Sequence, residues 1–121
     1  MQNSSEEEKK RGGKILVVCT ANVNRSPTAS WLIKLMNHEK EVWSRGSCQA
    51  ACRIHGGTFC QNEDLQNADQ IFCMEERNRK EILQINADCD DKVTILDIED
   101  KYKAFSKDLV MEIMVKLPQI E

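Results

Sequence analysis

Short apolar runs alternate with amphipathic segments along most of this chain. Four apolar runs predict strands, at Lys14–Cys19, 41–45, 70–74 and 92–96. Apolar residues at helical spacing, together with local start signals, predict helices at 27–38, 62–67, 75–86 and from Ser106 onward. Segment 49–61, which carries Gly56-Gly57, follows neither pattern.

The alternation of strands and helices predicts an α/β domain. Strands separated by helices pair in parallel through right-handed crossovers. We therefore expect a doubly wound, four-stranded parallel sheet that is flanked by helices. A chain of 121 residues suits one domain, which we place at residues 14–121. Residues 1–13 are polar and predict a flexible N-terminal tail.

The loop between the first strand and the first long helix holds the most informative residues. Cys19 ends the strand, Arg25 follows with five residues between them, and Ser26 and Pro27 suit the N-cap and the first helical position. A loop of this length points successive N–H groups inward as an anion nest, and the helix dipole adds positive charge. The spacing predicts a site for an oxyanion such as phosphate, with a thiol beneath it.

The residue types in this loop fit nucleophilic attack on phosphorus. The helix N-terminus and Arg25 favour the thiolate of Cys19, and the Ser26 hydroxyl can donate to the sulfur. The planar guanidinium of Arg25 can hold two phosphoryl oxygens. Backbone N–H groups from Thr20 to Arg25 complete the loop. The expected substrate-binding set comprises Thr20, Ala21, Asn22, Val23, Asn24, Arg25, Ser26 and, from a later loop, Tyr102.

Cleavage of a phosphate ester also needs a proton donor for the leaving oxygen. The loop after the fourth predicted strand supplies three carboxylates, on Asp97, Glu99 and Asp100. Ligands bind beyond the carboxyl ends of parallel strands, so these carboxylates are expected at the same edge of the sheet as Cys19. Tyr102 could wall the pocket and stack on an aromatic substrate. The residues alone leave the acid unassigned and fit a solvated acidic turn equally well.

Composition narrows the choice of partners. The net charge is −3 and there is no basic stripe, which argues against a nucleic-acid partner. No apolar run is long enough to cross a membrane and no secretory signal is present, so we expect a cytoplasmic protein without a membrane partner. We expect no cofactor and no metal.

The cysteines read as free thiols in a chain without an export signal. A zinc site is disfavoured because the spacings include no Cys-x2-Cys pair. The sequence leaves open the role of the five cysteines outside the loop, Cys48, Cys52, Cys60, Cys73 and Cys89.

Residues 18–27 resemble the phosphate loop of the low-molecular-weight protein tyrosine phosphatases. They share that family's Asn three residues after the nucleophile and its Arg-Ser-Pro ending. Residues 68–74 look like the family's third strand, and Asp100-Lys101-Tyr102 is similar to its Asp-Pro-Tyr. The likeness runs from about Lys14 to Leu117 and is strongest with a compact subgroup of small predicted phosphatases. It implies that family's fold and makes Asp100 the general acid.

Three departures from the family matter. Asn24 stands where many members carry a second cysteine that forms a protective disulfide with the nucleophile. Lys101 replaces the family's proline, which leaves Asp97 and Glu99 as possible acids. The segment between the second and third strands is short, and that region helps to wall the pocket in longer members.

These features lead us to expect a protein tyrosine phosphatase-like phosphomonoesterase that works through a cysteinyl-phosphate intermediate. Its substrate would be a phosphotyrosine protein or a small aryl phosphate, its loop would hold phosphate or another oxyanion, and we expect a monomer. One alternative is an arsenate reductase of the same fold, with Cys73 and Cys89 as resolving thiols. Another is a module that binds a phospho-ligand without turnover. A phosphoarginine phosphatase is disfavoured, since members with that activity carry Thr where Val23 stands.

Overall fold

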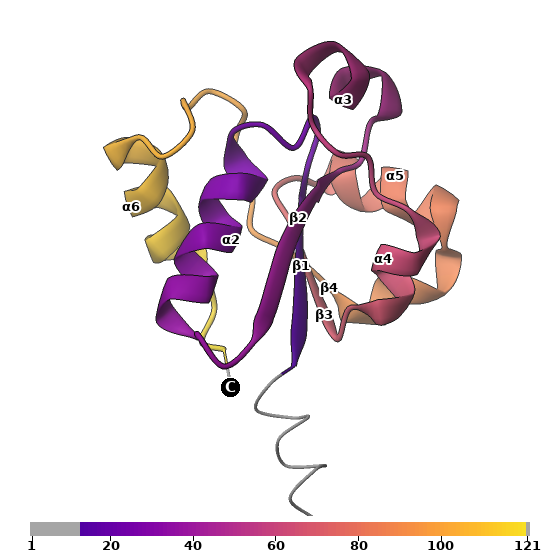
Figure 1. The fold of residues 1–121 in the computed structure, drawn as a ribbon, viewed down its shortest axis with the longest axis horizontal. Coiled ribbons are helices and arrows are strands. Elements are labelled where there is room, and N and C mark those ends of the chain that lie inside the picture. The colour runs from indigo at the N-terminus through magenta and orange to yellow at the C-terminus, as the bar shows by residue number, and fades with distance from the viewer. Residues whose placement is uncertain (1–12, 121) are drawn as a thin grey trace, which may run out of the picture.

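A computed structural model describes residues 13–120, so the predicted tail falls almost wholly outside the described residues. Its centre is one parallel sheet with strand order β2-β1-β3-β4 (Figure 1). The strands are β1 (Lys14–Cys19), β2 (Glu41–Gly46), β3 (Gln70–Cys73) and β4 (Val93–Ile95). The predicted four-stranded, doubly wound parallel sheet is thus confirmed.

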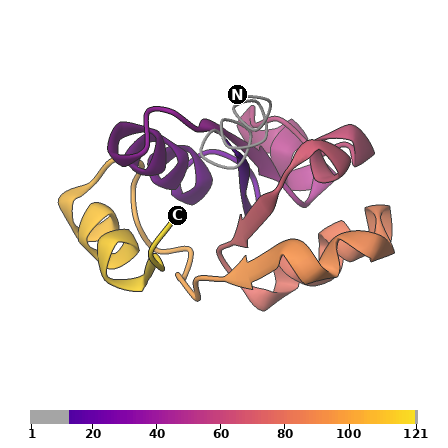
Figure 2. The ribbon, with the colours of Figure 1, turned by 90° about the horizontal axis from the view of Figure 1, so that it is seen from below.

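Helices cover both faces of the sheet (Figure 2). On one face lie α2 (Arg25–Met36) and α6 (Lys107–Lys116), and on the other lie α4 (Asn62–Asn67) and α5 (Glu76–Ile85). A 3-10 helix, η1 (Ala87–Lys92), follows α5. Residues 49–61, whose pattern predicted neither a strand nor a helix, contain α3 (Gln49–His55), a short helix beyond the carboxyl ends of the strands.

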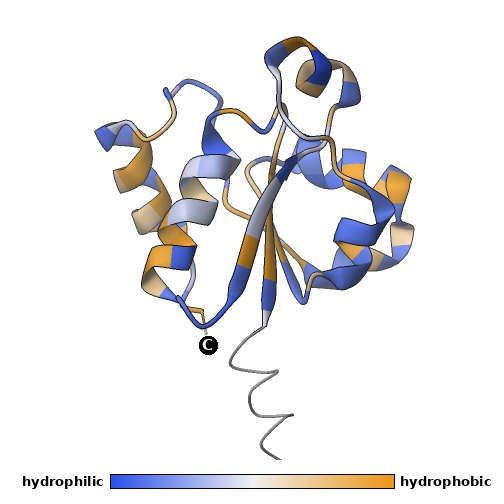
Figure 3. Cartoon of the chain, viewed as in Figure 1, coloured by the Kyte–Doolittle hydropathy of each residue, from blue (hydrophilic) through white to orange (hydrophobic). Residues whose placement is uncertain are grey.

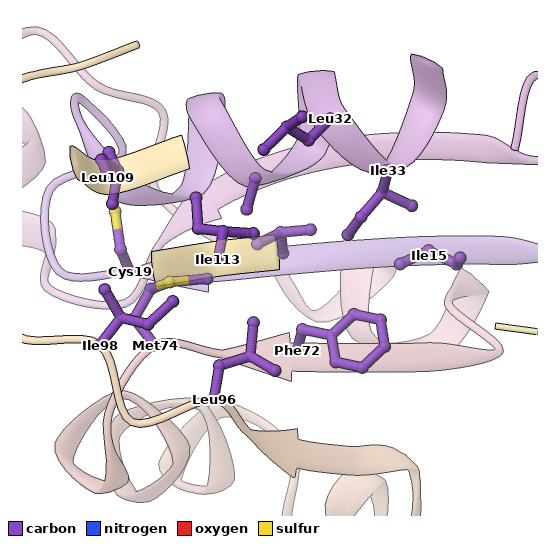
Figure 4. Close-up of a cluster of buried hydrophobic side chains, with 12 residues drawn as sticks. Ile15, Cys19, Leu32, Ile33, Phe72, Met74, Leu96, Ile98, Leu109 and Ile113 are labelled. Atoms are coloured by element: carbon purple, nitrogen blue, oxygen red, sulfur yellow. The ribbon is translucent and has the colours of Figure 1, made fainter. Parts of the chain in front are cut away.

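Alternate residues of β1 divide the apolar core into two layers. Ile15, Val17 and Cys19 face α2 and α6, where Phe72 completes the cluster (Figure 4). Leu16 and Val18 face the layer of α4 and α5. Figure 3 shows hydrophobic residues along the strands and a mixture of hydrophobic and polar residues along the helices. Burial on both faces explains why β1 reads as a continuous apolar run.

The sheet topology creates a crevice at the end of β1. From β1 the chain passes through α2 to β2 at the sheet edge, then crosses back to β3 on the other side of β1. Ligands in open α/β sheets bind at such a switch point, beyond the carboxyl ends of the strands. Cys19 is the last residue of β1 and therefore lies at this crevice.

Two local expectations are wrong. The N-cap of α2 is Asn24 rather than Ser26, because the helix begins at Arg25 and the Ser26 hydroxyl is engaged with Cys19 and Asn22. The sequence also predicts a side-chain pair between Glu75 and Arg79, which lie four residues apart on one predicted helix, and this pair is not formed. Glu75 turns to the buried Arg25, and Arg79 pairs with acidic residues on its other side, Glu76 and Asp90.

Candidate functional site

A pocket opens at the crevice, and the predicted loop forms its floor. The lining residues come from the loop, from α3 and from the loop after β4, and they are Cys19, Thr20, Ala21, Val23, Asn24, Arg25, Ala51, His55 and Asp100. The structure therefore brings the expected thiol, the expected guanidinium and one of the three candidate carboxylates to one pocket. The sequence reasoning did not anticipate the two residues from α3, Ala51 and His55.

Asn22 holds the loop in shape. Its backbone has a φ of 61°, in the left-handed region that Asn tolerates better than most residues. Its side-chain amide donates to the hydroxyls of Ser26 (2.9 Å) and Ser44 (2.8 Å), and its side-chain oxygen accepts the N–H of Thr58 (3.1 Å). Asn22 thus ties the loop to α2, to β2 and to the segment after α3, instead of lining the pocket.

Two glycines let neighbouring backbone press against the outside of the loop. A Cβ atom on Gly46 would lie 2.8 Å from the carbonyl oxygen of Thr20 and would overlap the sulfur of Cys52. A Cβ atom on Gly57 would overlap the carbonyl oxygen of Ala21. Only a residue without a side chain fits at either position unless the loop moves.

Cys19 is only 3% exposed, and its sulfur lies 3.1 Å from the Ser26 hydroxyl oxygen. That hydroxyl also accepts from Asn22, and its own hydrogen lies within reach of the sulfur and of the carbonyl oxygen of Arg45, which is 3.4 Å away. A hydrogen bond donated to sulfur favours the thiolate over the thiol. The N-terminus of α2 starts six residues further on and adds its positive end to the same pocket.

Arg25 is 1% exposed, and a guanidinium so deeply buried needs partners. Its Nη1 donates to Glu75 at 2.6 Å and to the carbonyl oxygen of Ile98 at 2.7 Å. Its Nη2 donates to the Thr20 hydroxyl at 3.3 Å, and its Nε lies 3.7 Å from Asp100. Nη1 is therefore held by Glu75 and Ile98. The edge formed by Nε and Nη2 lies beside the pocket residues Thr20 and Asp100.

Of the three candidate carboxylates, Asp100 alone lines the pocket. Its side chain is 61% exposed, so it can exchange protons with water. Asp97 has a φ of 60° and its carbonyl oxygen accepts from Lys116, on the α6 side. Tyr102 lines a separate surface hollow beside α6, and Lys101 lies over its ring at 5.5 Å.

Asn24 links the loop to the segment after β4. Its side-chain oxygen accepts the N–H of Ala104 at 3.2 Å, and the hydroxyl of Thr28 accepts the N–H of Phe105 at 2.9 Å. Both bonds anchor the loop after β4 to the start of α2. They help to place Asp100 at the pocket.

The sequence reasoning missed a second group of residues, at the start of α5. Glu75 is the N-cap of α5, and Asn78 in the first turn is fully buried, with its amide donating to Thr20 and Ser47. A usable signal was present, because both residues follow β3 at the same edge of the sheet as Cys19. The spacing of Glu75 and Arg79 on one helix suggested a surface pair instead, so this signal was not used.

Burial raises the pKa of four of the other thiols. The pKa of Cys60 rises to about 12, and those of Cys52, Cys73 and Cys89 also rise, in each case chiefly because burial penalises the thiolate. All six cysteines are free. Among residues 13–120, no cluster of three or more His, Cys, Asp or Glu could hold a metal ion. No helix in the described part of the chain is long and apolar enough to span a membrane.

Comparison with known proteins supports the fold. No family model and no curated protein matches the chain. Wzb of Vibrio vulnificus in complex with benzylphosphonate matches with a TM-score of 0.70 at 20% identity, over 86% of this chain and 91% of that one. The tyrosine phosphatase Wzb of Escherichia coli K30 in complex with phosphate matches with a TM-score of 0.67 at 23% identity, over 87% and 90%.

A low-molecular-weight phosphotyrosine phosphatase of Vibrio cholerae O395 matches with a TM-score of 0.64 at 21% identity, over 86% of this chain and 89% of that one. The chain therefore has the fold of the low-molecular-weight protein tyrosine phosphatases. The resemblance expected from residues 18–27 is confirmed at the level of the fold.

Proposed function

We propose that this chain hydrolyses phosphate monoesters, aryl phosphates such as phosphotyrosine above all, through a phosphorylated Cys19. The observation that carries the proposal is one pocket that holds Cys19, Arg25 and Asp100 around a loop at the N-terminus of α2. A thiol, a bidentate donor and a carboxyl group are the three parts that the reaction needs.

In the first step, the Cys19 thiolate attacks phosphorus in line with the leaving oxygen. The S–P bond forms while the P–O bond to the leaving group breaks, and the protonated Asp100 gives its proton to the departing oxygen. The Nε–Nη2 edge of Arg25 and the loop N–H groups hold the equatorial oxygens, where charge spreads in the transition state.

In the second step, water attacks the phosphorus of cysteinyl phosphate. The carboxylate of Asp100 takes the proton from this water, and Cys19 departs as a thiolate. Phosphate leaves, and Asp100 is again protonated for the next turnover.

The walls of the pocket support an aryl substrate. Val23 is 37% exposed, and it lines the pocket together with Ala51 and His55 from α3. These side chains offer apolar surface and an imidazole to a ring attached to the phosphate. One of the matching structures holds benzylphosphonate, in which a phosphorus oxyanion is likewise attached to an aromatic group.

The experiment is turnover of p-nitrophenyl phosphate and of a phosphotyrosine peptide in excess chelator. Wild type should turn over both substrates, and Cys19→Ser should lose activity by at least about a thousandfold, as removal of a catalytic nucleophile does. Cys48→Ser is the matched control, because Cys48 does not line the pocket, and it should keep wild-type rates. Rapid quenching during turnover of a substrate labelled in its phosphoryl group should trap the label on Cys19.

Parallel assays separate the alternatives. Arsenate reduction with a thiol reductant requires resolving thiols, and Cys73 and Cys89 are both buried with raised pKa values, which slows their attack. Phosphate binding without turnover in wild type would identify a binding module and overturn the proposal. Reduction of arsenate at rates that exceed phosphate ester hydrolysis would overturn it in favour of the reductase.

A further inference from the structure

Thr20 follows the proposed nucleophile directly and lines the pocket, and its hydroxyl has an unusual set of contacts. The oxygen accepts a hydrogen bond from Nη2 of Arg25 at 3.3 Å and another from the side-chain nitrogen of Asn78 at 3.2 Å. A threonine hydroxyl has two acceptor lone pairs and one hydrogen to donate. Both acceptor positions are therefore occupied by the protein.

The direction of each of these bonds is fixed by its neighbours. A guanidinium only donates, so the bond from Arg25 to Thr20 has one possible sense. The side-chain oxygen of Asn78 accepts the N–H of Glu75 at 3.0 Å, which places the Asn78 nitrogen toward Thr20. The other hydrogen of that nitrogen goes to the Ser47 hydroxyl at 3.0 Å.

Ser47 continues this series of hydrogen bonds from Asn78 to Glu81. Its hydroxyl lies 2.6 Å from a carboxylate oxygen of Glu81 and donates to it, which leaves Ser47 able only to accept from Asn78. The series of bonds from Glu81 through Ser47 and Asn78 to Thr20 thus has a single orientation. Its last member, the Thr20 hydroxyl, keeps one hydrogen, and no residue among 13–120 accepts it.

We propose that the Thr20 hydroxyl donates this hydrogen to an oxygen of the oxyanion bound above Cys19. Thr20 lines the pocket, so an oxyanion bound there is placed to accept this hydrogen. The side chain then adds a donor to the backbone N–H groups and Arg25. This inference rests on the proposed function for its ligand, a phosphoryl group, but it concerns binding and does not require turnover.

A hydroxyl whose lone pairs are both occupied can donate and cannot accept. It therefore pairs with an unprotonated oxygen of the phosphoryl group, as Arg25 and the backbone N–H groups also do. Removal of one preorganised donor to an oxyanion costs about a hundredfold in rate. We expect a loss of about tenfold to a hundredfold in phosphate affinity and turnover when the hydroxyl is removed.

The test compares Thr20→Val, which keeps the shape and loses the hydroxyl, with Thr20→Ser, which keeps the hydroxyl. Calorimetry with inorganic phosphate, at pH values on either side of its second ionisation, measures the affinity of each. Thr20→Val should bind phosphate about tenfold or more weakly at each pH, and Thr20→Ser should stay within about threefold of wild type. Equal affinity in wild type and Thr20→Val would overturn the proposal.

A crystal structure of wild type with phosphate supplies a measurement that does not depend on a variant's folding. A phosphate oxygen should lie about 2.5–3.0 Å from the hydroxyl oxygen of Thr20. A nearest phosphate oxygen beyond about 3.5 Å would overturn the proposal even if Thr20→Val binds weakly, because the loss would then come from the displaced Arg25. Phosphate binding that depends on Thr20 in a protein without turnover would support this inference while overturning the proposed phosphatase.

Discussion

At the scale of single residues, the contact between Asp100 and Arg25 bears on the proposed chemistry. Asp100 lies 3.7 Å from the Nε of Arg25, on the edge that we assign to phosphoryl oxygens. The same contact that brings the carboxyl group to the pocket would compete with a bound phosphate for that edge. A substrate should therefore move Asp100 from the guanidinium toward the leaving oxygen, and its exposed side chain leaves room for that movement.

We predict that Asp100→Asn slows hydrolysis of aryl phosphates by about a hundredfold or more, the usual share of general acid catalysis. The loss should shrink for leaving groups that depart without a proton, and the alkaline limb of the pH–rate profile should flatten. Steady-state kinetics over a series of substituted phenyl phosphates measures both effects.

Asp97→Asn and Glu99→Gln are matched controls from the same loop, and both should stay near wild type because neither residue lines the pocket. If Asp100→Asn kept wild-type rates while Asp97→Asn or Glu99→Gln lost most activity, the general acid would be reassigned to that residue. If all three variants were benign and Cys19→Ser were inactive, the transfer would run without a protein acid.

Residue by residue, the sequence led to the loop but not to what supports it. Cys19 and Arg25 could be predicted because their spacing, the preceding strand and the following Ser-Pro are local. Asp100 could be narrowed to three carboxylates by topology, and the family resemblance then chose among them. Glu75 and Asn78 escaped because their partners, Arg25 and Thr20, lie more than forty-five residues away in the chain. No local pattern reports such a contact.

At the scale of elements, the start of α5 supports the phosphate loop. Glu75 and Asn78 form the capping box at the start of α5, shortly after β3. Both side chains also hold the loop after β1, Glu75 through Arg25 and Asn78 through Thr20. The helix α3 acts differently, since its sequence offers a single fully buried residue, Cys52, and no amphipathic face to read. Its place beside the pocket is set by the close approach of Gly46 and Gly57 to the loop, which explains why segment 49–61 could not be interpreted from its own residues.

We predict that Glu75→Gln lowers turnover by about tenfold and destabilises the fold by about 1–3 kcal/mol, because the buried Arg25 loses its counter-charge. The amide keeps an acceptor for Nη1, so the protein should still fold. Glu76→Gln is the matched control, since that neighbouring carboxylate pairs with Arg79 on the surface and should change stability by less than about 0.5 kcal/mol. Urea unfolding and kinetics on both variants measure this, and equal effects at the two positions would contradict the assigned role of Glu75.

At the scale of the whole molecule, five of the six thiols are buried, and four of those five have raised pKa values. A thiol whose pKa is higher in the folded than in the unfolded chain contributes stability that is complete below the unfolded pKa. That contribution is lost as the pH rises toward the folded pKa, because the unfolded thiols ionise first.

We therefore predict that the free energy of unfolding falls between about pH 9 and pH 12, by up to about 1.4 kcal/mol per pH unit for each such thiol. Urea unfolding in reductant at several alkaline pH values measures the slope. Cys60→Ala should reduce the slope, since the folded pKa of Cys60 is raised to about 12, while Cys48→Ala, at a partly buried position, serves as the control. An unchanged slope in Cys60→Ala would contradict the linkage.

The distribution of thiols through the fold also governs how Cys19 withstands oxidation. A cysteine oxidised to sulfenic acid is rescued when a second thiol condenses with it, and otherwise proceeds to irreversible acids. The phosphate loop carries Asn24 where such a thiol would stand, and Asn24 is occupied with Ala104. The sulfur of Cys52 lies outside the loop, 3.8 Å from the carbonyl oxygen of Thr20, and burial raises its pKa, so little of it is thiolate.

We predict that prolonged exposure to peroxide inactivates the protein with poor recovery in dithiothreitol, and that mass spectrometry finds sulfinic and sulfonic acid at Cys19. Bound phosphate should protect, because Cys19 forms part of the pocket floor. Asn24→Cys provides the positive control, since a thiol within the loop should trap the sulfenic acid as a disulfide and restore recovery. Full recovery of wild-type activity in dithiothreitol would contradict the prediction. If wild type recovered and Cys52→Ser did not, Cys52 would be identified as a thiol that reaches Cys19 by a movement of α3.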